Sequence, residues 1–124
     1  MIKGIGNDII EIDRIAKAAE KESFIKRWFT ENEIVYFKEK NMRAETVAGS
    51  FSAKEAIAKA FGTGFSGFGA EEIEILRDKK GKPYVNLMGN ALKKAKELGI
   101  DKISISISHC REYASTVALC EGRE

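Results

Sequence analysis

The sequence predicts an α+β fold, in which helices and antiparallel strands share a single domain spanning residues 1–124. Apolar residues recur at helical intervals between about residues 41 and 61, which predicts one long helix. Residues 102–108 alternate strictly between apolar and polar, the pattern of a strand with one buried face. Two short runs, 73–77 and 83–87, flank a turn rich in Lys and Gly, which predicts an antiparallel hairpin.

Composition and charge exclude several classes of protein. The chain is 44% hydrophobic and 32% charged, which fits a globular protein with a modest core. A net charge of +2 provides no basic surface for nucleic acid, and no apolar run is long enough to span a membrane. Cys110 and Cys120 form no zinc-binding pattern, so we expect free thiols and a cytoplasmic protein.

Residues 1–12 predict a strand, because they are rich in isoleucine and carry glycines suited to close backbone contact. Alternation along this strand places Asp8 on a face with apolar neighbours. An alternative makes Asp8 the cap of a helix that begins at the next residue. The three isoleucines within 9–12 favour the strand, with a helix starting at Asp13.

The segment from Asp13 to about Lys21 predicts a short amphipathic helix with a basic edge. Arg14, Lys17 and Lys21 form that edge at spacings of three and four residues. Such an edge is either an ordinary solvated face or a docking surface for an acidic protein.

Local patterns predict the other helices and strands. Residues 24–38 carry five aromatic side chains, which we expect in the core or at a subunit contact, and include a Thr-x-x-Glu capping box. A helix over 89–98 is closed by Gly99, and a last strand over 113–120 runs antiparallel to its predecessor. The glycine-rich segment 62–69 matches no known phosphate-binding loop, so it indicates a phosphate contact only weakly.

Lys54 lies in the middle of the apolar stripe of the long helix, and Glu55 lies at its edge. Because an uncompensated buried charge is costly, this placement suggests a site that needs a cation and an anion side by side. Two alternatives need no function: Ser52-x-x-Glu55 matches a capping box, and Glu55 with Lys59 matches an exposed i, i+4 ion pair. The capping box requires a helix that begins near Ser52, whereas the upstream residues place its start near Asn41.

The candidate chemistry rests on two carboxylates, two lysines and one histidine. These residues are Asp8, Glu55, Lys54, Lys59 and His109. No nucleophile–base pair suited to covalent catalysis is evident, and a lone histidine is more often structural than a ligand. Two oxygen ligands completed by water and a substrate phosphate are typical of Mg²⁺ sites. The set therefore suits transfer or cleavage at a phosphate ester.

Two long motifs also resemble a known family. Residues 4–15 (GIGNDIIEIDRI) are similar to the N-terminal signature of the holo-acyl-carrier-protein synthases, the small bacterial 4′-phosphopantetheinyl transferases. Residues 51–60 (FSAKEAIAKA) resemble their second signature, and 62–64 (GTG) continue it. Further landmarks match in the same order at 80–83 (KGKP) and 106–109 (SISH), the latter followed by Tyr-Ala.

The resemblance implies a fold, an assembly and a reaction. The expected fold is an antiparallel sheet packed on one long helix with smaller helices, in a homotrimer whose three sites lie at subunit interfaces. The expected reaction transfers the phosphopantetheine arm of coenzyme A to a serine of apo-acyl carrier protein. The second product is adenosine 3′,5′-bisphosphate.

The resemblance also implies roles for individual residues. Asp8 and Glu55 would ligate Mg²⁺, and either Glu55 or a metal-held water would take the serine proton. Lys59 would contact the phosphates and share the catalytic role, while Arg14 and the basic edge would meet the acidic helix of the carrier protein. The residues expected to bind coenzyme A are Lys54, Lys59, Gly62, Gly64, Pro83 and His109.

The chain departs from the family pattern at Ser50, where arginine is common, and at Cys110, where a hydroxyl residue is common. A phosphate contact expected from the family at position 50 is therefore either missing or supplied by Arg43. Two other functions stay open on the residues alone. One is a non-catalytic α+β module that docks an acidic partner, and the other is a metal-dependent nucleotide phosphohydrolase that needs no carrier protein.

Overall fold

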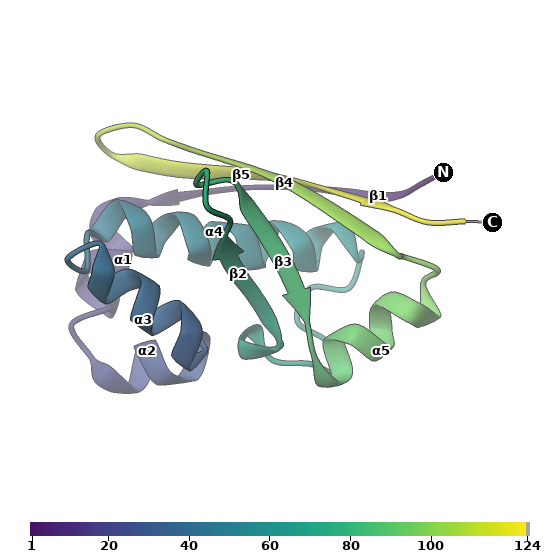
Figure 1. Cartoon of the computed structure of the whole chain (residues 1–124), viewed down its shortest axis with the longest axis horizontal. Coiled ribbons are helices and arrows are strands. Elements are labelled where there is room, and N and C mark those ends of the chain that lie inside the picture. The colour runs from purple at the N-terminus through teal and green to yellow at the C-terminus, as the bar shows by residue number, and fades with distance from the viewer. Residues whose placement is uncertain (124) are drawn as a thin grey trace.

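A three-stranded antiparallel sheet covers one side of the long helix (Figure 1). Its strands are β1 (Ile2–Glu11), β5 (Tyr113–Glu121) and β4 (Lys102–His109), in the order β1-β5-β4. The helix is α4 (Ala44–Ala60), which packs against β1 and β5. This computed structural model describes residues 1–123, and it confirms the expected α+β fold.

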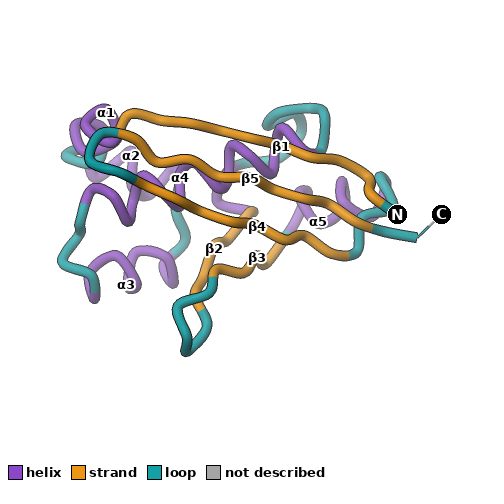
Figure 2. The backbone as a smooth tube through the Cα atoms, turned by 90° about the horizontal axis from the view of Figure 1, so that it is seen from above, coloured by secondary structure: helices purple, strands orange, loops and turns teal. Residues whose placement is uncertain are grey.

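The smaller elements surround α4 on its other sides. They are α1 (Ile12–Ala18), α2 (Glu22–Trp28), α3 (Glu31–Glu39), the 3₁₀ turn η1 (Ala70–Glu72), β2 (Ile73–Arg77), β3 (Pro83–Leu87) and α5 (Gly89–Glu97). Figure 1 shows α1, α2 and α3 gathered at one end of α4, with α5 towards the other end. Seen from above, the β2–β3 hairpin lies next to β4 (Figure 2). No helix within residues 1–123 is both long and apolar enough to cross a membrane.

The core divides into two clusters along α4. The first lies beneath the sheet, the hairpin and α5, and includes Ile57, Phe61, Ile73, Ile75, Ala91 and Ala118. The second lies between α4 and the three N-terminal helices, and includes Ile12, Ile15, Ile25, Phe29, Phe37 and Val47. Burial of these side chains holds the small helices and the hairpin on α4, because apolar area removed from water is the main stabilising term.

Strand β1 lies unusually close to α4. A methyl group added at Gly4 would overlap the carbonyl oxygen of Ala60, and one added at Gly6 would overlap that of Ala56. The two glycines therefore let the strand and the helix meet backbone to backbone, as the sequence predicted. Asp8 follows Gly6 by two residues on the same face of β1, so this contact brings its carboxylate beside α4.

The strand prediction for the N-terminus is confirmed, and the capping alternative for Asp8 is wrong. β1 runs through Asp8 to Glu11, where it pairs with β5 in the register Asp8 to Thr116. Helix α1 begins directly after the strand and ends at Ala18, three residues before Lys21. Lys21 is instead the residue that precedes α2, so the basic edge is divided between two helices.

The long helix begins at Ala44, and the expected start near Asn41 is wrong. Asn41 and Met42 have φ angles of 58° and 53°, in the left-handed region that a right-handed helix does not use. Ser52 lies in the middle of α4, so the capping-box alternative for Ser52 and Glu55 is also wrong.

The other local predictions are confirmed. The hairpin strands occupy 73–77 and 83–87 as predicted, and α5 and β4 differ from their expected bounds by one residue each. Thr30 and Glu33 form the capping box of α3. Gly62 and Gly64, with φ angles of 81° and 63°, follow the end of α4.

Candidate active site

A pocket of about 360 Å³ opens between β1, α1 and α4. Its polar lining consists of Asp8 from β1, Arg14 from α1 and Glu55 from α4. Its apolar wall includes Phe24 and Phe51, whose rings stack with centroids 6.0 Å apart. The sequence pattern predicts Phe24 in the core or at a subunit contact and predicts a site for neither ring. The only available signal was that Phe51 lies one turn before Glu55 on the same helix.

Asp8 is buried, with 8% of its surface exposed, and its two carboxylate oxygens differ. Oδ1 accepts a hydrogen bond from Lys59 Nζ at 3.2 Å, and the Asp8 backbone carbonyl accepts one from Ser115 Oγ at 2.9 Å. Oδ2 is buried and has no hydrogen-bond partner within residues 1–123. Because a buried acceptor without a partner is costly, this oxygen marks a place where an external cation or donor is accommodated.

Glu55 lies half-buried on α4 and faces the same pocket as Asp8. Burial raises the pKa of Glu55, and the negative charge of Asp8 raises it further, while Lys59 and Arg14 act in the opposite direction. Like charges that face one space repel, and a cation between them relieves that repulsion. The electrostatics of the pocket therefore favour a bound cation.

Lys59 pairs with Asp8 and not with Glu55. Its Nζ lies 3.2 Å from Asp8 Oδ1 and also donates to the carbonyl oxygen of Asn7 at 3.1 Å. The alternative i, i+4 ion pair with Glu55 is not formed in the described part of the chain. Because 54% of the Lys59 side chain stays exposed, its ammonium remains accessible to an anion in solution.

The residues present fit Mg²⁺. Residues 1–123 contain no group of three or more His, Cys, Asp or Glu side chains placed to hold a metal ion, so the protein offers two carboxylates, Asp8 and Glu55. Mg²⁺ is usually held by one or two carboxylates, with water and substrate phosphate completing the octahedron. A structural zinc site, in contrast, needs four protein ligands.

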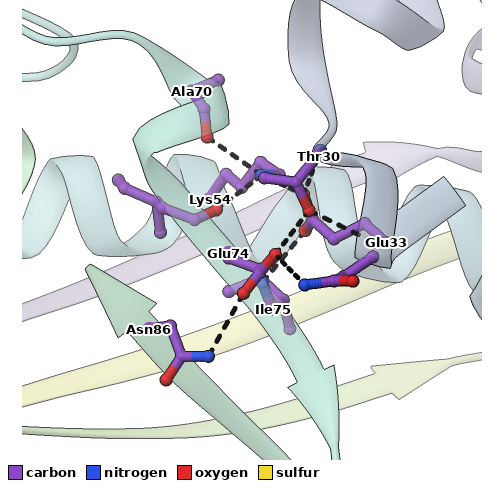
Figure 3. A network of polar contacts seen from close by, with 9 residues as sticks. Thr30, Glu33, Lys54, Ala70, Glu74, Ile75 and Asn86 are labelled. Atoms are coloured by element: carbon purple, nitrogen blue, oxygen red, sulfur yellow. Dashed lines mark hydrogen bonds and ion pairs between the residues drawn. The ribbon is translucent and has the colours of Figure 1, made fainter. Parts of the chain in front are cut away.

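Lys54 faces away from this pocket, into the interior between α3, α4 and η1 (Figure 3). Its side chain is fully buried, as predicted, and its ammonium donates to Glu33 Oε1 at 2.9 Å and to the carbonyl oxygens of Ala70 and Ile73. Lys54 and Glu55 therefore meet different neighbours, so the expectation that they stand together at one site is wrong. Lys54 has 0% of its surface exposed, so in this fold it is not available to contact a ligand directly.

The remaining predicted site residues do not line this pocket. Gly62 and Gly64 lie in the turn after α4, and Pro83 begins β3. His109 ends β4 as an exposed side chain, and its partner in β5 is Ala114, so a whole strand separates it from β1. One chain alone therefore does not bring Pro83 and His109 to Asp8 and Glu55.

The two departures from the family pattern lie in different surroundings. Ser50 is buried on α4, and its hydroxyl has no hydrogen-bond partner within the described residues. Cys110 is exposed in the β4–β5 turn, where the backbone groups of Glu112 and Tyr113 hold the pKa of its thiol below the usual value. Neither side chain lines the pocket.

Comparison with known proteins assigns this arrangement to a family. The model of the 4′-phosphopantetheinyl transferase superfamily matches residues 4–118. A holo-[acyl-carrier-protein] synthase from Clostridium tetani is 54% identical over 123 residues, which cover 98% of this chain and 98% of that protein.

Solved structures agree in fold as well as in sequence. The holo-ACP-synthase from Plasmodium yoelii superposes with a TM-score of 0.88 at 41% identity, covering 100% of this chain and 98% of that one. The Helicobacter pylori holo-[acyl-carrier-protein] synthase, solved in complex with coenzyme A, gives a TM-score of 0.82 at 32% identity, covering 94% and 99%. The chain therefore belongs to the 4′-phosphopantetheinyl transferase superfamily and, within it, to the holo-[acyl-carrier-protein] synthases.

Proposed function

We propose that this chain transfers the 4′-phosphopantetheine group of coenzyme A to a serine of apo-acyl carrier protein, in a Mg²⁺-dependent reaction. The products are holo-acyl carrier protein and adenosine 3′,5′-bisphosphate. One observation carries the proposal: Asp8 and Glu55 converge on one pocket, with an orphaned carboxylate oxygen, in a chain of this family. The coenzyme A complex of the Helicobacter pylori relative supports coenzyme A as the donor.

Asp8 and Glu55 are the residues that would hold Mg²⁺. Asp8 and Glu55 both line the pocket, Oδ2 of Asp8 has no hydrogen-bond partner within the described residues, and Glu55 forms no ion pair within them. There Mg²⁺ would supply charge neutralisation at the pyrophosphate of coenzyme A. Removal of either carboxylate is then expected to weaken divalent-ion binding and transfer together.

The reaction is a substitution at phosphorus. The serine hydroxyl oxygen attacks the phosphorus that bears the pantetheine arm, the bond from that phosphorus to the bridging oxygen breaks, and adenosine 3′,5′-bisphosphate leaves. The serine proton passes to Glu55 or to a water in the pocket. In the metal-free protein, burial and the charge of Asp8 raise the pKa of Glu55, and a cation between the two carboxylates would act in the opposite direction.

Lys59 and the basic edge have separate tasks in this scheme. The side chain of Lys59 is 54% exposed and lies next to Asp8, and we expect its ammonium to contact the phosphates of coenzyme A. Arg14 lies at the rim of the pocket, and Lys17 is exposed on the same helix. With Lys21, these cations provide a positive surface for the acidic helix of a carrier protein, with the serine directed into the pocket.

We further propose a cytoplasmic homotrimer with sites at subunit interfaces, formed by one transferase domain per chain. The outer face of the sheet exposes Ile5, Ile9 and Val117 at 68%, 64% and 43%, and such apolar patches are typical of interfaces. Pro83 and His109, which one chain holds away from its own pocket, could serve the site of a neighbouring copy. The two free cysteines suit a reducing compartment.

The direct test is a transfer assay. The protein is incubated with coenzyme A, Mg²⁺ and apo-acyl carrier protein, and the carrier is weighed by mass spectrometry. We expect a mass gain of one phosphopantetheine group, which is lost when a chelator removes the metal. Absence of the adduct with a competent carrier protein would contradict the proposal, and nucleotide turnover without any carrier would favour a phosphohydrolase.

A further inference from the structure

A closed polar network lies on the side of α4 that faces away from the pocket, and the reaction scheme does not use it. We call it the closed network and define it as Lys54 with Glu33, Glu74 and the groups bonded to them (Figure 3). Lys54 and Glu33 both have 0% of their side chains exposed and form an ion pair at 2.9 Å. The three protons of the Lys54 ammonium are donated to three acceptors, which come from three different elements.

Glu33 is fixed as firmly as Lys54. Its Oε1 also accepts from the backbone N–H of Thr30 at 2.9 Å, and its Oε2 accepts from the backbone N–H of Ile75 at 3.0 Å. One carboxylate thus ties the start of α3 to strand β2 and, through Lys54, to α4.

Glu74 extends the closed network to the second strand of the hairpin. Thr30 Oγ1 donates to Glu74 Oε2 at 2.6 Å, and the side-chain amides of Asn32 and Asn86 donate to the same carboxylate. The hairpin that carries Pro83 and the helix that carries Glu55 are therefore anchored to one set of hydrogen bonds.

Stability alone does not account for such a network. Taking a lysine and a glutamate out of water costs several kcal/mol per ion in general, and replacing a buried pair with apolar residues is often neutral or stabilising. What the pair provides is geometry, because three bonds to fixed acceptors allow Lys54 one position. Its neighbour Glu55 lies about 100° further round the helix. A rotation of α4 that displaced Lys54 would move Glu55 relative to Asp8.

We propose that Lys54 is a positioning residue, whose three-point attachment fixes the rotation of α4 and so aims Glu55 at the space it shares with Asp8. Asp8 itself is held by the close contact of Gly6 with the same helix. The inference rests on the proposed function, since it concerns the two carboxylates assigned to the metal.

The test uses a charge-balanced double variant, Lys54→Met with Glu33→Gln. It removes the ion pair without a change in net charge, and the glutamine oxygen still accepts a hydrogen bond from the backbone N–H of Thr30 or of Ile75. The matched control removes the exposed pair Glu22 and Lys26, at 79% and 68% side-chain exposure, by Lys26→Met with Glu22→Gln. The readouts are the folded fraction, Mn²⁺ affinity without substrates, and kcat and KM for the carrier protein.

If Lys54 positions Glu55, the folded double variant binds Mn²⁺ roughly tenfold or more weakly and loses kcat by a similar factor. Its KM for the carrier protein stays unchanged, and the control keeps all the values of the unmodified protein. A folded double variant with unaltered Mn²⁺ affinity and kcat would overturn the proposal. Failure of the unmodified protein to bind Mn²⁺ at all would instead count against the proposed function.

A milder pair of variants decides the question if the double variant does not fold. Glu33→Gln is compared with Glu31→Gln, which makes the same charge change at an exposed position of the same helix. Weaker Mn²⁺ binding by Glu33→Gln than by Glu31→Gln supports the positioning role, and equal binding overturns it.

Discussion

Helix α4 separates two clusters of charged residues whose hydrogen bonding differs completely. In the closed network, Lys54 and both oxygens of Glu33 have partners, and neither side chain is exposed. The other cluster, which we call the open site, consists of Asp8 and Glu55 in the pocket and of Lys59, which pairs with Asp8. One carboxylate oxygen of Asp8 has no partner there within the described residues. Two like charges face each other there, and a lysine reaches solvent.

How completely the polar groups are hydrogen-bonded within the protein distinguishes a structural cluster from a functional one better than residue type does. Both clusters contain lysine and carboxylates, and adjacent residues of one helix serve them. A cluster whose donors and acceptors are all matched inside the protein gains nothing from a ligand. In a cluster with an unpartnered oxygen and repelling charges, a bound ligand supplies the missing partner and relieves the repulsion. Until the ligand binds, such a cluster lowers the stability of the fold.

The largest effect is expected for Glu55→Gln. Loss of this carboxylate should reduce transfer by about a hundredfold or more, because it removes a proposed Mg²⁺ ligand and with it the stabilisation that the ion would give to the developing charge. Folding raises the pKa of Glu55, so at pH 7 its ionised carboxylate destabilises the metal-free folded protein. Glu55→Gln removes that charge, so the metal-free variant should unfold at a higher temperature than the unmodified protein. The exposed Glu39→Gln on α3 serves as the control. Near-normal transfer by Glu55→Gln would mean that Glu55 is not a metal ligand.

Gly6→Ala should damage the open site from its other side. The added methyl group overlaps the carbonyl oxygen of Ala56, so β1 must move away from α4 and take Asp8 with it. Overpacking of this kind costs about 1–3 kcal/mol in unfolding free energy, measurable by urea denaturation. Mn²⁺ affinity should fall as well. The control is Asn7→Ala, which changes the exposed residue next to Gly6 and should alter neither the unfolding free energy nor the Mn²⁺ affinity. If Gly6→Ala binds Mn²⁺ normally, the close contact between β1 and α4 does not position Asp8.

Arg14→Ala tests the rim of the open site and is expected to have a smaller effect. The KM for carrier protein should rise several-fold while the KM for coenzyme A changes little, because a rim charge acts mainly on the encounter with an acidic partner. Steady-state kinetics with each substrate varied in turn separates the two constants. Lys93→Ala, at an exposed position on α5, is the matched control. Equal increases in both constants would eliminate the docking role of Arg14.

The smallest effect is a shift in the titration of Glu55, measured by carbon-13 NMR of its carboxyl group in the metal-free protein. Asp8→Asn removes a like charge and should lower the pKa of Glu55, and Lys59→Met removes a cation and should raise it. Because protons and divalent ions compete for this carboxylate, Mg²⁺ affinity should weaken as the pH falls through that pKa. A pKa of Glu55 that neither variant alters would show that the three groups do not share one site.

Much of the fold could be predicted from local sequence patterns, because residues close together in the sequence determine those elements. The hairpin bounds, the α3 capping box and the last two strands were all predicted from alternation, turn residues or caps. The start of α4 was not, because Asn41 and Met42 adopt left-handed φ angles, which asparagine tolerates but which the helical spacing of the apolar residues does not indicate.

The partners of charged residues were harder to predict than the residues themselves. The sequence showed that Lys54 is buried and needs an anion, but it did not identify Glu33 as that anion. Its place in the Thr30–Glu33 capping box already gave Glu33 a role at the start of α3. The i, i+4 rule paired Lys59 with Glu55, whereas the fold brings Asp8 from 51 residues away. The pocket wall of Phe24 and Phe51 likewise depends on packing between separate helices.

The most direct test is a crystal structure of the protein with coenzyme A and Mg²⁺. We expect one ion with an oxygen of Asp8 and an oxygen of Glu55 both at about 2.1 Å, while Lys54 keeps its contact with Glu33. A structure in which the two carboxylates bind separate ions, or turn away from each other with coenzyme A in place, would contradict the shared site.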